Sequence, residues 1–67
     1  MNNNEIRIII SALIIYVQTS YRVKKVTKPT NEAKRLIGKM IDKLPEHNRD
    51  EWLGMAEEAG ISLHELA

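Results

Sequence analysis

The feature that most constrains this chain is an apolar run near its start, IIISALIIYV, from Ile8 to Val17. Only Ser11 interrupts the aliphatic and aromatic side chains, so nearly every position of the segment favours removal from water. A segment of this kind can cross a membrane, form a buried strand, or form a helix that needs partners on several sides.

The periodicity of the wider segment, residues 5–22, favours a helix over a strand. A half-buried strand alternates apolar and polar residues, whereas here both alternate sets are apolar, and the run is long for a fully buried strand. Wound at about 100° per residue, the segment collects its polar side chains in one narrow stripe. That stripe consists of Arg7, Ser11, Gln18 and Arg22. The sequence therefore predicts a helix that is apolar around most of its circumference, with a buried strand as the alternative.

The same run is too short and too closely flanked by polar residues to indicate a membrane span. A bilayer needs about 20 consecutive apolar residues, and Arg7 and Gln18 bracket a shorter stretch. A signal peptide is also disfavoured, because the start MNNNE is not basic and no small-residue cleavage site follows. A membrane partner is therefore not expected, although arginine side chains that snorkel would permit one.

The size of the chain indicates how the predicted helix is covered. A domain of 67 residues buries only about 60% of the surface that its unfolded form exposes. The chain has no cysteine, and its two histidines, His47 and His64, lie outside any metal-ligand spacing. We therefore predict a homodimer or larger assembly through the first helix, and a helix wrapped wholly by its own chain is the alternative. The predicted oligomer interface consists of Ile8, Ile9, Leu13, Ile15 and Tyr16.

Residues 30–44 predict a second helix. Pro29 disfavours helical geometry at Lys28, so Thr30 or Asn31 is the expected N-cap. Apolar side chains then recur at three- and four-residue spacing, at Ala33, Leu36, Ile37, Met40, Ile41 and Leu44. The opposite face is basic and is expected to carry Lys34, Arg35, Lys39 and Lys43.

Residues 48–59 predict a third, shorter helix. Asn48 and Glu51 have the spacing of a capping box at its start, and Gly60 stands where a left-handed C-cap is needed. Its expected apolar side consists of Trp52, Leu53, Met55, Ala56 and Ala59. Residues 62–65 repeat the capping-box pattern and predict a short C-terminal turn.

Charge is divided unevenly along the chain, although its net value is only +1. Residues 22–43 carry eight basic and two acidic side chains, a net charge of +6, and residues 44–67 carry one and six, a net charge of −5. A basic segment can neutralise phosphates in a salt-sensitive way, or it can simply keep a helix face in water. The candidate nucleic-acid-binding residues are Lys24, Lys25, Lys28, Arg35, Lys39 and Lys43.

The acidic third helix is a candidate docking face for a partner protein. An exposed Trp52 or Leu53 surrounded by carboxylates would give such a face an apolar centre. The candidate residues are Asp50, Glu51, Trp52, Leu53, Glu57 and Glu58.

An enzyme is not expected. The sequence contains no glycine-rich phosphate loop, nucleophile elbow or HExxH motif. Glu57 and Glu58 are adjacent, so on a helix they point about 100° apart rather than into one site. The sequence therefore predicts no catalytic residue, no metal and no cofactor.

The segment LPEHNRDEWLGMAEEAGISLHEL, residues 44–66, resembles the part of ribbon-helix-helix regulators and antitoxins that enters their first helix. The resemblance implies core positions at Trp52, Met55 and Ala56, and a turn at Gly60. It covers about a third of the chain and implies a shared local motif rather than a shared fold, because the preceding GKMIDK is helical in pattern where the family has a strand. No DNA-reading residue is carried over.

The sequence thus predicts a single all-α domain of residues 1–67, with residues 1–3 frayed and helices near 4–23, 30–44 and 48–59. The function it favours is that of a small, cytoplasmic, non-enzymatic regulatory or inhibitory protein that acts by binding an unidentified protein. The alternative is a nucleic-acid-binding accessory protein or transcription regulator that uses the basic segment 22–43.

Overall fold

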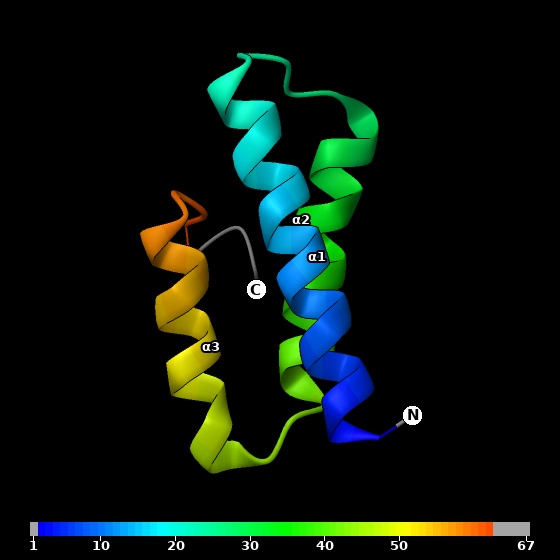
Figure 1. Ribbon diagram of the computed structural model, residues 1–67, viewed down its shortest axis with the longest axis vertical. Helices are drawn as coiled ribbons and strands as arrows, with labels where there is room; N and C mark the ends of the chain where they lie inside the picture. Colours follow the sequence, from blue (N-terminus) through cyan, green and yellow to red (C-terminus); the bar gives the residue numbers. More distant parts are fainter. Residues whose placement is uncertain (1, 63–67) are drawn as a thin grey trace.

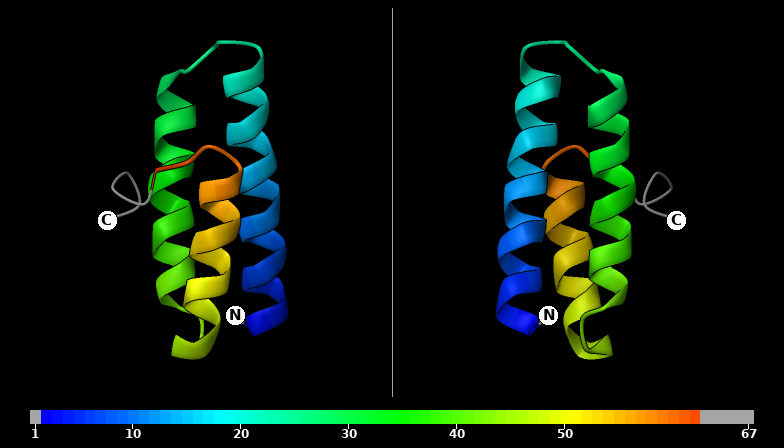
Figure 2. Two further views of the ribbon diagram at one scale, coloured as in Figure 1. Left: turned by 90° about the vertical axis from the view of Figure 1, so that its left-hand side faces the viewer. Right: turned by 90° about the vertical axis from the view of Figure 1, so that its right-hand side faces the viewer.

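A computed structural model describes residues 2–62, which form three helices: α1 (Asn3–Arg22), α2 (Lys28–Asp42) and α3 (Glu46–Glu58). Figure 1 shows α1 and α2 as an antiparallel pair, and Figure 2 shows α3 packed across one side of that pair. The predicted all-α class is confirmed, and each helix begins and ends within two residues of its predicted bounds. The strand alternative for the first segment is wrong.

Helix α1 begins earlier than expected because its first residues are capped. The Asn2 side-chain oxygen accepts a hydrogen bond from the Glu5 backbone N–H at 2.9 Å, and Asn2 Nδ2 donates to Glu5 Oε1 at 2.8 Å. The first of these bonds satisfies a backbone N–H that an uncapped helix start would leave to water. Asn2 is thus the N-cap of α1 and Asn3 is its first residue, within the stretch expected to be frayed.

Helix α2 begins at Lys28, so the prediction of an N-cap at Thr30 or Asn31 is wrong. Thr27 is the N-cap, and its backbone N–H donates to Thr30 Oγ1 at 3.2 Å. Pro29 therefore lies in the first helical turn, where its missing N–H leaves no helical bond unmade. The Thr30 hydroxyl also donates to Ser20 Oγ at 3.2 Å, which joins the start of α2 to the end of α1.

Helix α3 begins at Glu46, with Pro45 as its N-cap, so the predicted Asn48–Glu51 capping box is wrong. The side chain of Arg49 turns back to the end of α2 instead. Its Nε donates to the Leu44 carbonyl at 3.1 Å and its Nη2 donates to the Asp42 carbonyl at 2.9 Å. One guanidinium therefore satisfies two carbonyls that the end of α2 leaves without a helical partner.

The predicted left-handed cap at Gly60 is confirmed. Gly60 has φ +90°, its N–H donates to the Glu57 carbonyl at 2.9 Å, and the Ile61 N–H donates to the Ala56 carbonyl at 3.0 Å. Both Ile61 and Ala56 are fully buried, which is the apolar contact that accompanies this cap. The predicted C-terminal turn extends beyond the described residues.

The same cap ends α1, but with a lysine in the left-handed position. Lys24 has φ +57°, its N–H donates to the Tyr21 carbonyl at 3.1 Å, and the Lys25 N–H donates to the Ser20 carbonyl at 2.9 Å. A side chain in this region of backbone space is strained, which is why glycine usually stands there.

The core lies where the three helices meet, and isoleucine dominates it. Its most buried large side chains are Ile10, Ile37, Ile41, Leu44, Ile61 and Val17. Two side chains expected in the core, Leu36 and Met55, are 38% and 42% exposed, because the apolar stripes of α2 and α3 are wider than the surface that neighbouring helices cover. Lys34, expected on the outer basic face, is buried instead, with its Nζ 5.2 Å from the centre of the Tyr21 ring.

Candidate functional site

One side of α1 is left uncovered by the rest of the described chain. Ile8 is 68% exposed and Ile15 is 62% exposed, although isoleucine is among the residues most often found inside proteins. Tyr16 is 46% exposed, Ala12 is exposed and Ile9 is half-buried. We call these five residues the open face of α1.

The open face includes four of the five residues predicted as an oligomer interface. The fifth, Leu13, is half-buried and packs against the core. The alternative in which the chain wraps its first helix on all sides is wrong for residues 2–62, because α3 lies against the opposite side of the α1–α2 pair (Figure 2). The polar stripe of α1 lies between Ile15 and the side of the helix that faces the core. The open face therefore borders the core along only one of its two edges, the edge toward α2.

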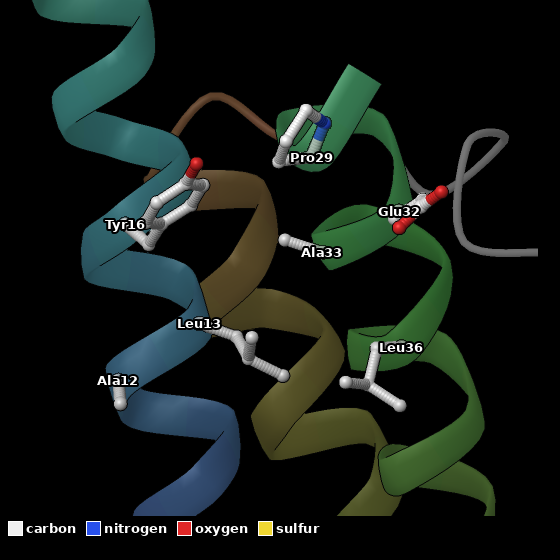
Figure 3. Close-up of a pocket in the computed structure, with 7 residues that line it drawn as sticks. All are labelled: Ala12, Leu13, Tyr16, Pro29, Glu32, Ala33 and Leu36. Atoms are coloured by element: carbon white, nitrogen blue, oxygen red, sulfur yellow. The ribbon is translucent and has the colours of Figure 1, made fainter. Parts of the chain in front are cut away.

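A groove between α1 and α2 continues the open face on the side away from α3. Figure 3 shows the side chains that line it, with α3 behind them. The groove has a volume of about 540 Å³ and is lined by Ala12, Leu13, Tyr16, Pro29, Glu32, Ala33 and Leu36. The ionisable groups among these lining residues are the Glu32 carboxyl and the Tyr16 hydroxyl. The groove therefore offers apolar contact rather than a paired acid and base.

The sequence did not indicate that Leu36, Pro29 and Ala12 belong to this surface. Leu36 fits the apolar spacing of α2, and the sequence predicts Pro29 before the helix rather than in it. The signal that could have found them is the width of the apolar stripe on α2, which exceeds what one neighbouring helix covers.

The basic side chains predicted to contact nucleic acid are all exposed, and they fall into two adjoining sets. The first set, Lys24, Lys25 and Lys28, lies at the connection between α1 and α2. The second set runs along α2 at four-residue spacing and consists of Arg35, Lys39 and Lys43. We call these six residues the basic edge. Arg35 and Lys39 border a second depression of about 360 Å³ beside the groove, so positive charge lies on the α2 side of the apolar surface.

The predicted acidic docking face is only partly as expected. Asp50, Glu51, Glu57 and Glu58 are exposed. An exposed Trp52 or Leu53 was expected, but both are half-buried and pack against the core. The exposed apolar residue of α3 is Met55, which was expected in the core. We call the exposed Asp50, Glu51, Met55, Glu57 and Glu58 the acidic surface of α3.

Two other kinds of site, a metal centre and a membrane-spanning helix, are absent from the part of the chain that the structure describes. Between residues 2 and 62, no group of three or more His, Cys, Asp or Glu side chains is arranged to hold a metal ion. None of the three helices combines the length and the apolar character required to span a bilayer.

Comparison with known proteins adds no relative. No family model, curated protein or solved structure matches this chain. The local resemblance of residues 44–66 to ribbon-helix-helix regulators stays a prediction, and the surfaces described above are the basis for inferring function.

Proposed function

We propose that this chain is a small non-enzymatic regulatory or inhibitory protein that acts by binding another protein, as a homodimer formed through α1. The observation that carries the proposal is the open face of α1, where Ile8, Ile15 and Tyr16 are 68%, 62% and 46% exposed. The lack of cysteine fits a cytoplasmic location, which we include in the proposal.

The area of this surface supports association. Four side chains, Ile8, Ile15, Tyr16 and Leu36, are between 38% and 68% exposed. At about 200 Å² each, they leave roughly 400 Å² of apolar surface in contact with water. That area lies in the range at which patches on small proteins are often functional, roughly 300–600 Å². Two such faces supply roughly 800 Å², so the half-buried residues and the groove around them must contribute the remainder of the roughly 1,200 Å² that the smaller specific interfaces bury.

The acidic surface of α3 supports a separate contact with the regulated protein. It lies on α3, away from the open face, so a dimer formed through α1 leaves it accessible (Figure 2). Met55 is 42% exposed and lies one helical turn from both Glu51 and Glu58, so it adds an apolar contact at one margin of the acidic surface. A basic surface on the target is its complement, and the charge would chiefly accelerate association.

Sedimentation velocity over a range of concentrations tests the dimer. We expect the wild-type chain to be a dimer, Ile15→Glu to be a monomer because it places a carboxylate in the interface, and Gln18→Glu to remain a dimer. Gln18 is exposed on the same helix but within the polar stripe, so it is the matched control. A wild-type chain that stays monomeric at every concentration contradicts the proposal.

The regulated protein is tested with a charge reversal on α3. A protein recovered by cross-linking qualifies as the target when it binds the purified chain stoichiometrically. Its affinity must fall with the double variant Glu51→Lys, Glu58→Lys but not with Lys43→Glu, directly after α2. Equal binding by both variants would show that the acidic surface is not the docking face.

A nucleic-acid-binding accessory protein or transcription regulator is the second candidate, supported by the exposure of all six residues of the basic edge. Phosphate contacts by these side chains would give duplex binding that weakens steeply with salt. Each lysine removed from such an interface should lower the salt slope by about one. Titration of random-sequence duplex DNA at low salt tests this candidate, and an absence of binding there excludes it.

A further inference from the structure

The open face of α1 is symmetric in spacing about Ala12. Ile8 and Tyr16 lie four residues before and after Ala12, and Ile9 and Ile15 lie three residues before and after it. Consider two identical helices that run antiparallel, with the two-fold axis at one residue. A residue that lies a given number of positions before the axis in one helix then faces the residue that lies the same number of positions after it in the other helix. The open face is therefore complementary to a second copy of itself in the antiparallel orientation.

We propose that a second copy of the chain covers the open face with its α1 antiparallel to the first and the two-fold axis at Ala12. This inference rests on the homodimer proposed above and adds the orientation of its two copies. Ile8 then lies against Tyr16 of the second copy, and Ile9 lies against Ile15 of the second copy. Ala12 faces itself at the centre, where a small side chain lets the helix axes approach to about 8 Å.

Charge at the two ends of α1 selects the antiparallel orientation. Glu5 is exposed in the first turn, and Arg22 is exposed in the last turn, followed by Lys24 and Lys25. The antiparallel pair places each Glu5 within about one turn of the Arg22 of the other copy. A parallel pair would instead bring Glu5 to Glu5 and the basic ends together, and it would align the two helix dipoles.

The position of Glu5 is fixed before association. Asn2 Nδ2 donates to its Oε1 at 2.8 Å, so one carboxylate oxygen is held at the N-terminal end of the helix. Its exposure leaves the second oxygen accessible to a guanidinium from another chain. The centre of the open face carries no charge, so the two ends alone determine the electrostatic preference.

Single cysteines test the orientation directly, because the chain contains none of its own. Under mild oxidation, Ala12→Cys should form a disulfide-linked dimer in either orientation, since position 12 faces itself in both. Ile8→Cys and Tyr16→Cys should each stay monomeric on a denaturing gel when alone, and should cross-link when the two variants are mixed. Gln18→Cys, on the polar stripe, is the control that should not cross-link.

The outcomes separate the two proposals. A wild-type chain that sediments as a monomer, with no cross-link at Ala12→Cys, overturns the dimer itself. A dimer in which Ile8→Cys cross-links alone, or in which Ala12→Cys does not cross-link, overturns the antiparallel arrangement and leaves the dimer standing.

Charge reversal gives a second measurement that leaves the apolar contacts in place. Glu5→Lys should weaken the dimer about fivefold at low salt, because the symmetric interface loses two weak ion pairs of the surface type. The double variant Glu5→Lys, Arg22→Glu should recover the wild-type affinity, and high salt should reduce the difference. Failure of the double variant to recover affinity refutes the pairing of these two ends.

Discussion

Replacing Lys24 by glycine should stabilise the protein. Lys24 is held at φ +57° by the two cap hydrogen bonds at the end of α1, and glycine adopts this conformation without the clash that a Cβ brings. Relief of that strain contributes about 1 kcal/mol or more. The greater freedom of glycine in the unfolded chain opposes the gain by roughly 0.5 kcal/mol. The net expectation is about 0.5–1 kcal/mol, or a rise of roughly 3–6 °C in Tm for a chain of this size.

Lys25→Gly is the matched control for this experiment. It removes the same charge from the next position, which is also exposed but has no positive φ, so it should be neutral or slightly destabilising. Urea denaturation followed by circular dichroism, at one fixed protein concentration, measures both variants. If Lys24→Gly is no more stable than Lys25→Gly, the backbone at Lys24 is not strained and the reasoning fails.

Three further predictions concern packing and capping. Gly60→Ala should cost about 1 kcal/mol of stability, because alanine is strained in the left-handed backbone conformation of this position. No clash adds to that cost, since the added Cβ would lie at an ordinary 3.8 Å from Tyr21 Cδ2. A loss well above that value in thermal denaturation would point to a steric clash instead. Arg49→Ala should cost about 1–3 kcal/mol of stability, because two carbonyls at the end of α2 lose a charged donor. If urea denaturation detects no loss of stability, water replaces the guanidinium. Ile10→Ala should cost about 2–5 kcal/mol by opening a cavity in the core, whereas Ile8→Ala should weaken association with little effect on the folding of the single chain. Equal losses in calorimetry and sedimentation for the last two variants would contradict the assignment of one face to the core and the other to the surface.

The helices could be predicted because their signals are local and periodic. The polar stripe of α1 and the apolar spacing of α2 each repeat over several turns, and Gly60 stands directly after the last predicted helical residue, Ala59, where few other residues fit. The helix starts were less predictable, since a proline is compatible with both the outside of a helix and its first turn. Pro29 lies inside α2, whereas Pro45 lies just before α3.

The parts that could not be predicted depend on which helix covers which face. Leu36 and Trp52 are both apolar residues on amphipathic helices, yet the first lines an open groove and the second packs against the core. That difference arises from the placement of α3 on one side of the α1–α2 pair, which spacing along a single helix does not encode. Lys34 belongs to the same class, because its long stem allows burial beside Tyr21 even though Arg35 and Lys39, predicted on the same basic face, are exposed.

The attachment of α3 has a consequence for motion within the domain. Along its length, α3 has one fully buried residue, Ala56, whereas Leu44 before the helix and Ile61 after it are both buried. Between these two ends α3 is held by Ala56 and by the half-buried Trp52 and Leu53, so its amide protons should exchange with solvent through partial openings that leave the α1–α2 pair intact. Trp52, the one tryptophan of the chain, lies on this segment, so its fluorescence would report each such opening separately from global unfolding.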